Sequence, residues 1–433
     1  MFHWKCAGEG VKTEALRIAM ISMHSSPVGE LGTRDTGGMS VYIGEIARRL
    51  AGSGCAVDIF TRLQHSGSAK TVEPFPGVRI VHLPAGPPKA LPHLVLYRHL
   101  PQFWENLESF RHTERIQYDL VHSHYYLSGQ IGRWAREHWN VPHVLMFHTL
   151  GMLKNRIAGS EKEPLLRIAL EKRIVKECDA ILAGTEREKR DLIDLYVAPP
   201  HKIQVVPCGV DLERFHPSAR CESRKRLRLN NGTSVLLYVG RFDPIKGVDR
   251  LLGAAHLLRR DLRLHVLLVG GDGENTPEEQ ALRAMCRELS LDDCVTFVGR
   301  RDHYKLPDYY RAADVLVLPS HYESFGLVVL EALSCGTPVV AMRVGALEDI
   351  VHNGLNGWIV AENTCKDLAE GIRRVLKQHD AQKPTADSIR ATVVDYDWRL
   401  VADAIHSKYR MLIGEGGSRH QVATDIRTIG ESQ

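Results

Sequence analysis

The sequence predicts an α/β protein of two domains, each an α/β/α arrangement around a parallel sheet, that face each other across a cleft. Three observations support this fold class. Short apolar runs alternate with amphipathic segments, which is typical of parallel strands joined by helical crossovers. The alternation stops near residue 206 and starts again at residue 234. The 433 residues, 44% hydrophobic and 25% charged, are enough for two ordinary globular domains.

The first domain is expected over residues 15–205. Its first strand is the buried run "RIAMISM" at residues 17–23, and residues 37–54 form a helix in which Val41, Ile43 and Ile46 lie near helical spacing. Further strands are expected at residues 56–62, 78–86, 118–126, 143–149 and 180–185.

A linker is expected after residue 205, because "VVPCGVDLERFHPSAR" contains two prolines and a glycine followed by polar residues. The second domain then covers residues 210–395. Its strands are expected at residues 234–240, 264–271, 294–300, 314–320, 338–342 and 357–360. Residues 396–413 are expected to form a helix that packs back on the first domain, and the polar residues 414–433 a loose tail.

Composition excludes several classes of protein. A net charge of +4 is too small to indicate a nucleic-acid binder. The nine scattered cysteines contain no C-x-x-C pair, which favours a reducing compartment over a zinc ribbon or a disulfide framework. No apolar segment is long enough for a signal peptide or a membrane span, so a cytoplasmic protein is expected. The amphipathic, basic segment 161–179 is either a solvated face or a peripheral contact with a membrane or an anionic acceptor.

Ligands of open α/β sheets bind beyond the carboxyl ends of the strands, and three segments at such ends could hold an anion. Gly37 and Gly38 stand at a helix start, where free amides attract phosphate. Arg241 and Lys246 follow the strand 234–240 and could bind a diphosphate, although solvated surface cations are the alternative. None of these segments is a dinucleotide fingerprint or a Walker motif.

The third segment is "HYESFGLVVLEALSCG", in which Glu323 and Glu331 stand eight residues apart. Ser324 is expected to cap a helix that starts near Phe325 and Gly326, which places Glu323 on the loop and Glu331 inside the helix. The helix-start amides favour phosphate, and a neighbouring carboxylate accepts hydrogen bonds from sugar hydroxyls. The alternative is a core helix with two stray acids.

Histidines offer weaker signals. His148 ends the strand 143–149, where a lone histidine is more often structural than catalytic. The pair in "HSHYY" has no third ligand at matching spacing, so no metal site is expected. The acidic pair around Tyr396 lies far from the other motifs and is interpreted as a turn.

Taken together, the segments resemble the retaining glycosyltransferases of the GT-B type, family four, with two Rossmann-like domains. The motifs are "ESFGLVVLEALSCGTPVVA", "VGRFDPIKG", "VVPCGVD" and "RAADVLVLPS", and the resemblance covers about residues 17–410. In the first domain, "MHSSPVGELGTRDTGGMSVYI" and "HTLGMLKN" resemble the branch that holds the sucrose-phosphate synthases and the mycothiol-pathway transferase of N-acetylglucosamine to inositol phosphate.

The resemblance implies a role for each matching residue. His148 contacts the reacting sugar, Arg241 and Lys246 bind the donor diphosphate, and Glu323 holds hydroxyls of the transferred sugar. The other donor contacts it implies are Gly38 and the amides of Phe325, Gly326 and Leu327 near the diphosphate, the backbone of Gly299 and Arg300 near the base, and Glu331 at the ribose. It implies no cofactor and no metal.

On the acceptor side the resemblance implies Tyr125 and Thr149, with Arg167 and Lys89 as cations for a phosphate. The segment "PPKALPHLVLYRHLP" around Lys89 departs from the branch. We therefore expect transfer of a glucose-type or N-acetylglucosamine-type hexose from a UDP-sugar to a small, phosphorylated acceptor. The alternatives are a nucleotide-sugar epimerase of the same fold and a nucleotide-sugar-binding protein without turnover; no oligomeric state is predicted.

Overall fold

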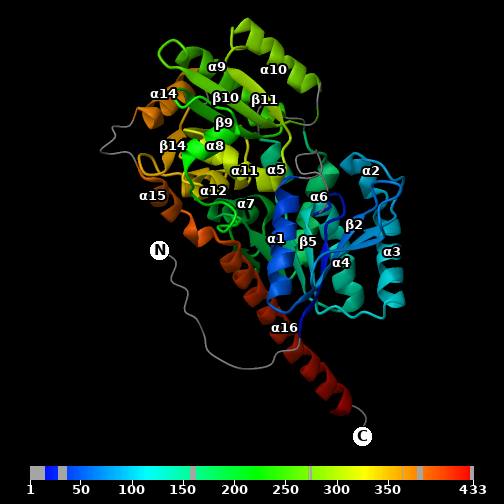
Figure 1. The fold of residues 1–433 in the computed structure, drawn as a ribbon. Helices are drawn as coiled ribbons and strands as arrows, with labels where there is room; N and C mark the ends of the chain where they lie inside the picture. The colour runs from blue at the N-terminus through cyan, green and yellow to red at the C-terminus, as the bar shows by residue number, and fades with distance from the viewer. Residues whose placement is uncertain are drawn as a thin grey trace.

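A computed structural model describes residues 15–27, 37–156, 162–271, 273, 276–362, 364–377 and 384–429, with the backbone alone for residues 415–429. It contains two parallel-sheet α/β domains (Figure 1), which confirms the predicted fold class. Residues 28–36 of the loop before Gly37 lie outside the described residues, as do residues 430–433 at the end of the predicted tail.

The first sheet has the strand order β3-β4-β2-β1-β5-β6-β7-β8. Every neighbouring pair is parallel except β3 and β4. The strands are β1 (Arg17–Ile21), β2 (Ala56–Arg62), β3 (Thr71–Phe75), β4 (Val78–Leu83), β5 (Leu120–His124), β6 (His143–Met146), β7 (Ala180–Ala183) and β8 (Ile203–Val205).

The second sheet has the order β11-β10-β9-β12-β13-β14 and is parallel throughout. Its strands are β9 (Ser234–Gly240), β10 (Leu264–Gly270), β11 (Val295–Gly299), β12 (Val315–Leu318), β13 (Val339–Met342) and β14 (Gly357–Val360). In both sheets the first strand in sequence lies inside the sheet, so helical crossovers run to both sides of it.

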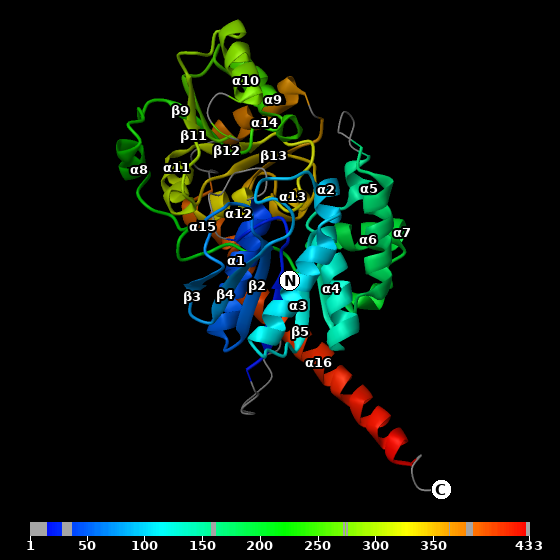
Figure 2. The same cartoon turned by 90° about the vertical axis from the view of Figure 1, so that its right-hand side faces the viewer.

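Helices cover both faces of each sheet (Figure 2). Those that follow the first-domain strands are α1 (Gly38–Gly52), α2 (His93–Tyr97), α3 (Leu100–Thr113), α4 (Tyr125–Trp139), α5 (Gly151–Lys154), α6 (Leu165–Glu177) and α7 (Glu186–Tyr196). Those of the second are α8 (Arg220–Arg226), α9 (Val248–Leu258), α10 (Pro277–Glu288), α11 (Leu306–Ala312), α12 (Leu327–Ser334), α13 (Leu347–Ile350), α14 (Cys365–Leu376) and α15 (Ala386–Ala391).

The cores follow from the alternation of side chains along each strand. In β1, Ile18 and Met20 point to the face covered by α1, while Ala19 and Ile21 belong to the core under α3 and α4. All four side chains are fully buried. This burial on both faces explains why β1 is an unbroken apolar run.

The chain passes between the domains twice, and the two passages are bonded to each other. Val210 donates from its amide to the carbonyl of Tyr396 (2.8 Å) and accepts from the amide of Trp398 (3.3 Å). Trp398 is 2% exposed, packs edge-on against Tyr42 of α1 at 5.4 Å between ring centroids, and lies over Gly209. The linker and the return passage therefore form one small hinge region.

The last helix, α16 (Trp398–Ile429), packs on α1 of the first domain (Figure 1). Tyr409 is fully buried, and its hydroxyl lies 2.6 Å from His122 Nδ1 of β5. The helix continues beyond residue 413, where the sequence predicted a loose tail. That prediction relied on the polar composition of residues 414–433, and polar residues such as glutamate, glutamine and arginine are themselves good helix formers.

Candidate functional site

A cleft of about 480 Å³ lies between the two domains at the carboxyl ends of both sheets. Most of the residues singled out from the sequence line it, although they come from six separate segments of the chain. The predicted site residues that line the cleft are Gly38, Tyr125, His148, Thr149, Arg241, Lys246, Arg300, Glu323, Phe325, Gly326, Leu327 and Glu331.

Two helix starts face each other across this cleft. A side chain at Gly38, the first residue of α1, would lie 3.4 Å from Leu327, the first residue of α12. The amino ends of both helices carry partial positive charge and free amides. An anion between them is therefore stabilised from both domains, as expected for a diphosphate.

The start of α12 differs from the prediction in one respect. The residue before the helix is Gly326 in the left-handed conformation (φ +81°), and no side chain caps the helix. The Ser324 hydroxyl instead lies 3.5 Å from the hydroxyl of Tyr322. A Cβ at this position would lie 2.7 Å from Leu347, so both the close approach of that side chain and the positive φ require glycine.

The two predicted cations of the donor site, Arg241 and Lys246, each lie beside a carboxylate. Lys246 Nζ donates to Glu323 Oε2 at 2.6 Å, and both side chains are mostly buried, at 20% and 16% exposed. Arg241 stands 3.5 Å from Asp243, whose carboxylate also holds the turn at Pro244–Lys246 through the Ile245 amide. The ammonium keeps two further N–H groups for a ligand, so the pair orients Lys246 without exhausting it.

Glu331 lies in an apolar helix and is 5% exposed, and both its carboxylate oxygens are bonded. Oε1 is 2.6 Å from His303 Nε2, and Oε2 accepts from the hydroxyl of Tyr310 at 2.6 Å. Burial lowers the pKa of His303, but the charge of Glu331 and its hydrogen bond outweigh burial and raise that pKa above its usual value. These partners explain how a carboxylate is tolerated at this depth.

His148 is held in a strained backbone conformation (φ +61°) at the end of the first-domain sheet. Its Nε2 lies 3.0 Å from His124 Nδ1, and the ring of Tyr42 packs edge-on against it at 5.3 Å. Burial lowers the pKa of His148 to about 3. The imidazole is therefore neutral at physiological pH and would act on a ligand through hydrogen bonds, not through a charge.

At the acceptor end, Tyr125 and Thr149 line the cleft while Arg167 lies behind them. Arg167 is 1% exposed, its guanidinium packs over the Tyr125 ring at 4.8 Å, and it donates to Thr149 Oγ1 at 3.1 Å. It also pairs with Glu163 (2.9 Å) and Glu171 (2.7 Å). Arg167 therefore lies against Tyr125 and Thr149 and does not itself line the cleft, and its expected phosphate contact stays a prediction.

Besides Arg167, two predicted contacts do not line the cleft. The Lys89 side chain is exposed, and the backbone carbonyl of Lys89 accepts a hydrogen bond from Arg62 at 2.6 Å. The structure therefore does not bring Lys89 to the cleft. Gly299 also lies outside the cleft, although its neighbour Arg300 lines it. The residue of this region that reaches the cleft is His93, the first residue of α2, whose Nδ1 is 3.3 Å from the Tyr125 hydroxyl.

The cleft contains further polar residues that the sequence analysis did not single out. They are His24, His93, Lys154, Arg301 and His303. His24 and Arg301 stand just beyond the ends of β1 and β11, so the strand-end rule that found Arg241 would have found both. Lys154 forms an ion pair with Glu163. No local spacing rule predicts this pair, because Lys154 ends α5 and Glu163 lies before α6.

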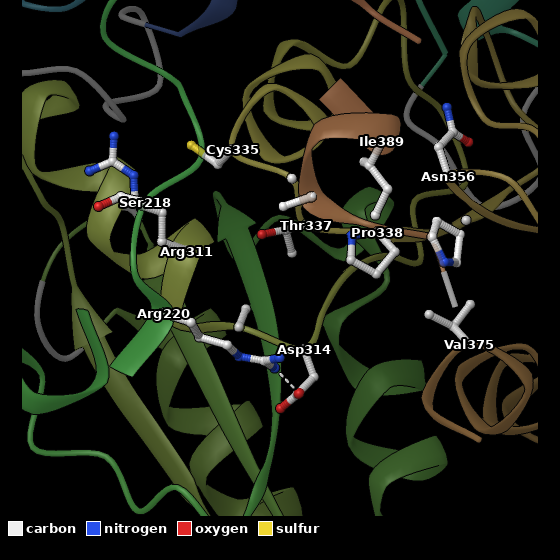
Figure 3. Close-up of a pocket in the computed structure, with 15 residues that line it drawn as sticks. Ser218, Arg220, Arg311, Asp314, Cys335, Thr337, Pro338, Asn356, Val375 and Ile389 are labelled. Carbon is white, nitrogen blue, oxygen red and sulfur yellow. Dashed lines mark ion pairs between the residues drawn. The ribbon is translucent and has the colours of Figure 1, made fainter. Parts of the chain in front are cut away.

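Two other hollows contain none of the predicted site residues, and one of them, of about 500 Å³ between Arg220 and Ser234, is open and lies away from the cleft. A smaller hollow of about 170 Å³ lies at the amino ends of β12, β13 and β14, where Arg220 faces Asp314 (Figure 3), and it contains no predicted site residue. Within the described residues, no group of three or more His, Cys, Asp or Glu side chains could hold a metal ion. In the same part of the chain, no helix is both long and apolar enough to cross a membrane.

The two facing domains and the cleft between their strand ends define a glycosyltransferase of the GT-B architecture. The sucrose-phosphate synthase of Thermosynechococcus elongatus superimposes with a TM-score of 0.86 at 32% identity, over 92% of this chain and 100% of that one. The HepE protein of Anabaena, solved with UDP-glucose, shares the fold at 18% identity, with a TM-score of 0.73 over 92% of this chain and 100% of that one.

The chain belongs to glycosyltransferase family 4: residues 36–214 match "Glycosyltransferase Family 4" and residues 219–391 match "Glycosyl transferases group 1". Among its relatives are D-inositol 3-phosphate glycosyltransferases. That of Saccharomonospora viridis is 40% identical over 91% of this chain and 94% of its own length. A second, from Catenulispora acidiphila, is 42% identical over the same shares. The resemblance inferred from the motifs is thereby confirmed.

Proposed function

We propose that this glycosyltransferase moves a hexose, of the glucose or N-acetylglucosamine type, from a UDP-sugar to a hydroxyl of a small phosphorylated sugar or cyclitol, with retention of anomeric configuration. The observation that carries the proposal is the convergence of Arg241, Lys246, Glu323 and two helix starts on one cleft. Each of these groups suits one part of a sugar diphosphate.

The leaving group accounts for the cations. Cleavage of a sugar–phosphate bond places negative charge on the departing diphosphate, and charges aimed at it lower the barrier. Arg241 and Lys246 supply two cations, and the amides beyond Gly326 supply the positive end of α12. Glu323, fixed by Lys246, accepts hydroxyls of the transferred hexose, and Glu331 accepts those of the ribose.

The state of the two cleft carboxylates bears on the route by which the proposed retention would occur, and it argues against a covalent intermediate. A covalent glycosyl intermediate needs a carboxylate free to attack the anomeric carbon. Among the described residues that line the cleft, the carboxylates are Glu323 and Glu331, and both are engaged, by Lys246 and by His303 with Tyr310. We infer a front-face substitution in which an oxygen of the departing phosphate takes the acceptor proton, while neutral His148 donates or accepts at the sugar.

The acceptor is proposed from the first-domain side of the cleft. Tyr125, Thr149, Lys154 and His93 offer two hydroxyls, an ammonium and an imidazole, which together suit a phosphate ester. Relatives about 40% identical over more than nine-tenths of this chain carry the name D-inositol 3-phosphate glycosyltransferase. Inositol phosphate is therefore the first acceptor to test.

The test is an array of donors and acceptors read by mass spectrometry. UDP-, ADP- and GDP-linked glucose and N-acetylglucosamine are each offered with inositol phosphate, hexose 6-phosphates and unphosphorylated inositol. Lys246→Ala and Glu323→Ala are assayed beside Lys225→Ala, which removes an exposed lysine of α8 outside the cleft. The anomeric configuration of the product is read by NMR.

We expect one UDP-sugar and one phosphorylated acceptor to give an α-linked product, with both cleft variants impaired and Lys225→Ala unaffected. Undiminished turnover in both cleft variants would overturn the site. An epimerised sugar formed from the donor alone would identify an epimerase. Tight UDP-sugar binding in calorimetry without transfer to any acceptor would identify a binding protein without turnover.

A further inference from the structure

The nucleoside end of the cleft is connected to the interdomain linker by a line of polar contacts. The line begins at Glu331 of α12, continues through His303, and ends at Arg214, which lies in the linker between the domains. Glu331 and His303 line the cleft, whereas Arg214 does not. Neither of these two contacts follows from helix or strand geometry, because each joins residues distant in the sequence.

The first link holds the carboxylate from behind. His303 Nε2 and the Tyr310 hydroxyl each occupy one acceptor position of Glu331, at 2.6 Å. A carboxylate has about four such positions, so one remains on each oxygen. The two remaining positions suit adjacent hydroxyls of a ribose, provided that the carboxylate does not rotate.

The second link orients the histidine. Arg214 Nη1 lies 3.0 Å from His303 Nδ1, and a guanidinium only donates. His303 Nδ1 is therefore the acceptor, and the ring proton sits on Nε2, which donates to Glu331. The ring of Phe215 packs against His303 at 5.1 Å and against Tyr310 at 5.9 Å, so the imidazole has little freedom to turn.

The third link anchors Arg214 in the hinge region. Asp211, 7% exposed, accepts the backbone amide of Arg214 at 3.1 Å. Its carboxylate is held from the first domain by Arg48 at 3.4 Å and Arg49 at 4.0 Å, both in the last turns of α1. The position of the linker is thus transmitted to Glu331 through one arginine and one histidine.

We propose that His303 and Arg214 are positioning residues for the donor nucleoside: they hold Glu331 in the orientation that binds the ribose and tie that orientation to the linker. This inference rests on the proposed function, in which Glu331 contacts the ribose. It adds a second role to the linker, which then contributes to donor affinity as well as joining the domains.

The test measures UDP affinity by calorimetry, together with donor KM and kcat. His303→Ala removes the contact to Glu331, and we expect UDP affinity to fall and donor KM to rise about 10-fold or more, with kcat changed by less than about 3-fold. His303→Gln keeps an N–H for Glu331 and an oxygen for Arg214, and we expect it to restore affinity to within about 3-fold of the parent. Thermal unfolding confirms that each variant is folded.

A double-mutant cycle separates positioning from general damage to the fold. If His303 acts through Glu331, His303→Ala adds little further loss of UDP affinity in a Glu331→Ala background. Arg214→Met is expected to weaken UDP binding less than His303→Ala does. Independent losses in the cycle, or full affinity in His303→Ala, would overturn the inference. If Glu331→Ala itself binds UDP normally, the proposed function of the site fails instead.

The pH dependence gives one more readout. The groups that face His303 are Glu331, Tyr310, Arg214 and, at longer range, Glu45 of α1. Protonation would place a second N–H against Arg214 and break that link in acid, while the contact with Glu331 becomes a charge-assisted hydrogen bond. We expect UDP affinity to fall more between pH 8 and pH 6 in the parent than in His303→Gln, whose amide gains no proton. Equal falls in both proteins would contradict the assigned tautomer.

Discussion

The ion pair between Lys246 and Glu323 gives the sharpest test of the donor site, because its two members are assigned to different parts of one ligand. Nζ and Oε2 are 2.6 Å apart, and the side chains are 20% and 16% exposed. At the effective dielectric of a partly buried site, two unit charges about 4 Å apart attract by about 4 kcal/mol before desolvation is subtracted. The pair is therefore strong enough to fix Lys246 in one direction.

Lys246→Ala removes one charged donor from the diphosphate, worth about 1.5–3 kcal/mol. That corresponds to a fall in kcat/KM of about 10- to 150-fold. Glu323→Ala is expected to act in the same range, since it removes a hydroxyl acceptor and also releases the lysine. In the Glu323→Ala background the lysine is no longer oriented, so its removal is expected to cost less.

The assay is UDP-sugar turnover for the four proteins of the cycle, with Lys225→Ala as the matched control. We expect the double variant to lose about 1 kcal/mol less than the sum of the single losses. Losses that add would show that the two residues act independently, and the reasoning from the ion pair would then be wrong. Thermal unfolding of each variant shows whether a lone buried Glu323 destabilises the protein.

Three further predictions concern single positions. Gly326→Ala places a methyl group at φ +81°, 2.7 Å from Leu347 and 3.4 Å from Glu323, so we expect a loss of stability of at least about 1–2 kcal/mol together with weaker UDP binding. Gly354→Ala has a similar φ of +80° and no atom within 4 Å, so it should show the backbone cost alone. Equal UDP binding in both variants would contradict the proposed cradle. Burial raises the pKa of Glu188 to about 7, so the native state keeps the Glu188 proton to a higher pH than the unfolded chain does. The free energy of unfolding therefore falls as the pH rises from about 4.5 through 7. Glu188→Gln should remove about 1–3 kcal/mol of that fall, as measured by thermal unfolding across this pH range. Trp398→Ala should lower the free energy of unfolding, measured by chemical denaturation, by about 3–5 kcal/mol. Leu400 is 53% exposed on the same helix, so Leu400→Ala should change it by less than about 0.5 kcal/mol. Similar losses in both variants would refute a hinge role for Trp398.

The strands that were predictable are those buried on both faces, because double burial leaves an unbroken apolar run. β1 and β9 are of this kind and lie where the sequence placed them. β3 was missed, since its residues are exposed or half-buried and it contains Pro74, which an edge strand tolerates. β8 was missed because it has three residues and continues directly into the linker.

The strand-end rule also explains how far the site was predictable. Arg241 and Lys246 stand just beyond β9 and line the cleft, since a parallel sheet brings all its carboxyl ends to one edge. Lys89 was chosen for its charge, in a loop whose course the sequence does not define. The loop carbonyl is bound by Arg62, and the chain enters the cleft only where α2 begins, at His93.

The orientation of Glu331 depends on contacts of a kind that no local pattern contains. An apolar helix with one buried carboxylate requires partners for that carboxylate, and the sequence alone states the requirement without naming them. The partners, His303 and Tyr310, come from the segment that follows β11, and Arg214 from the linker. Arg214 and Glu331 are more than a hundred residues apart in the sequence and are connected through His303. Such a connection forms only when both sheets have packed against the linker. The same closure brings Gly38 against Leu327, so the proposed phosphate cradle and the proposed ribose contact depend on one interdomain arrangement. Donor binding is therefore expected to report on the hinge region as directly as on the residues that touch the nucleotide.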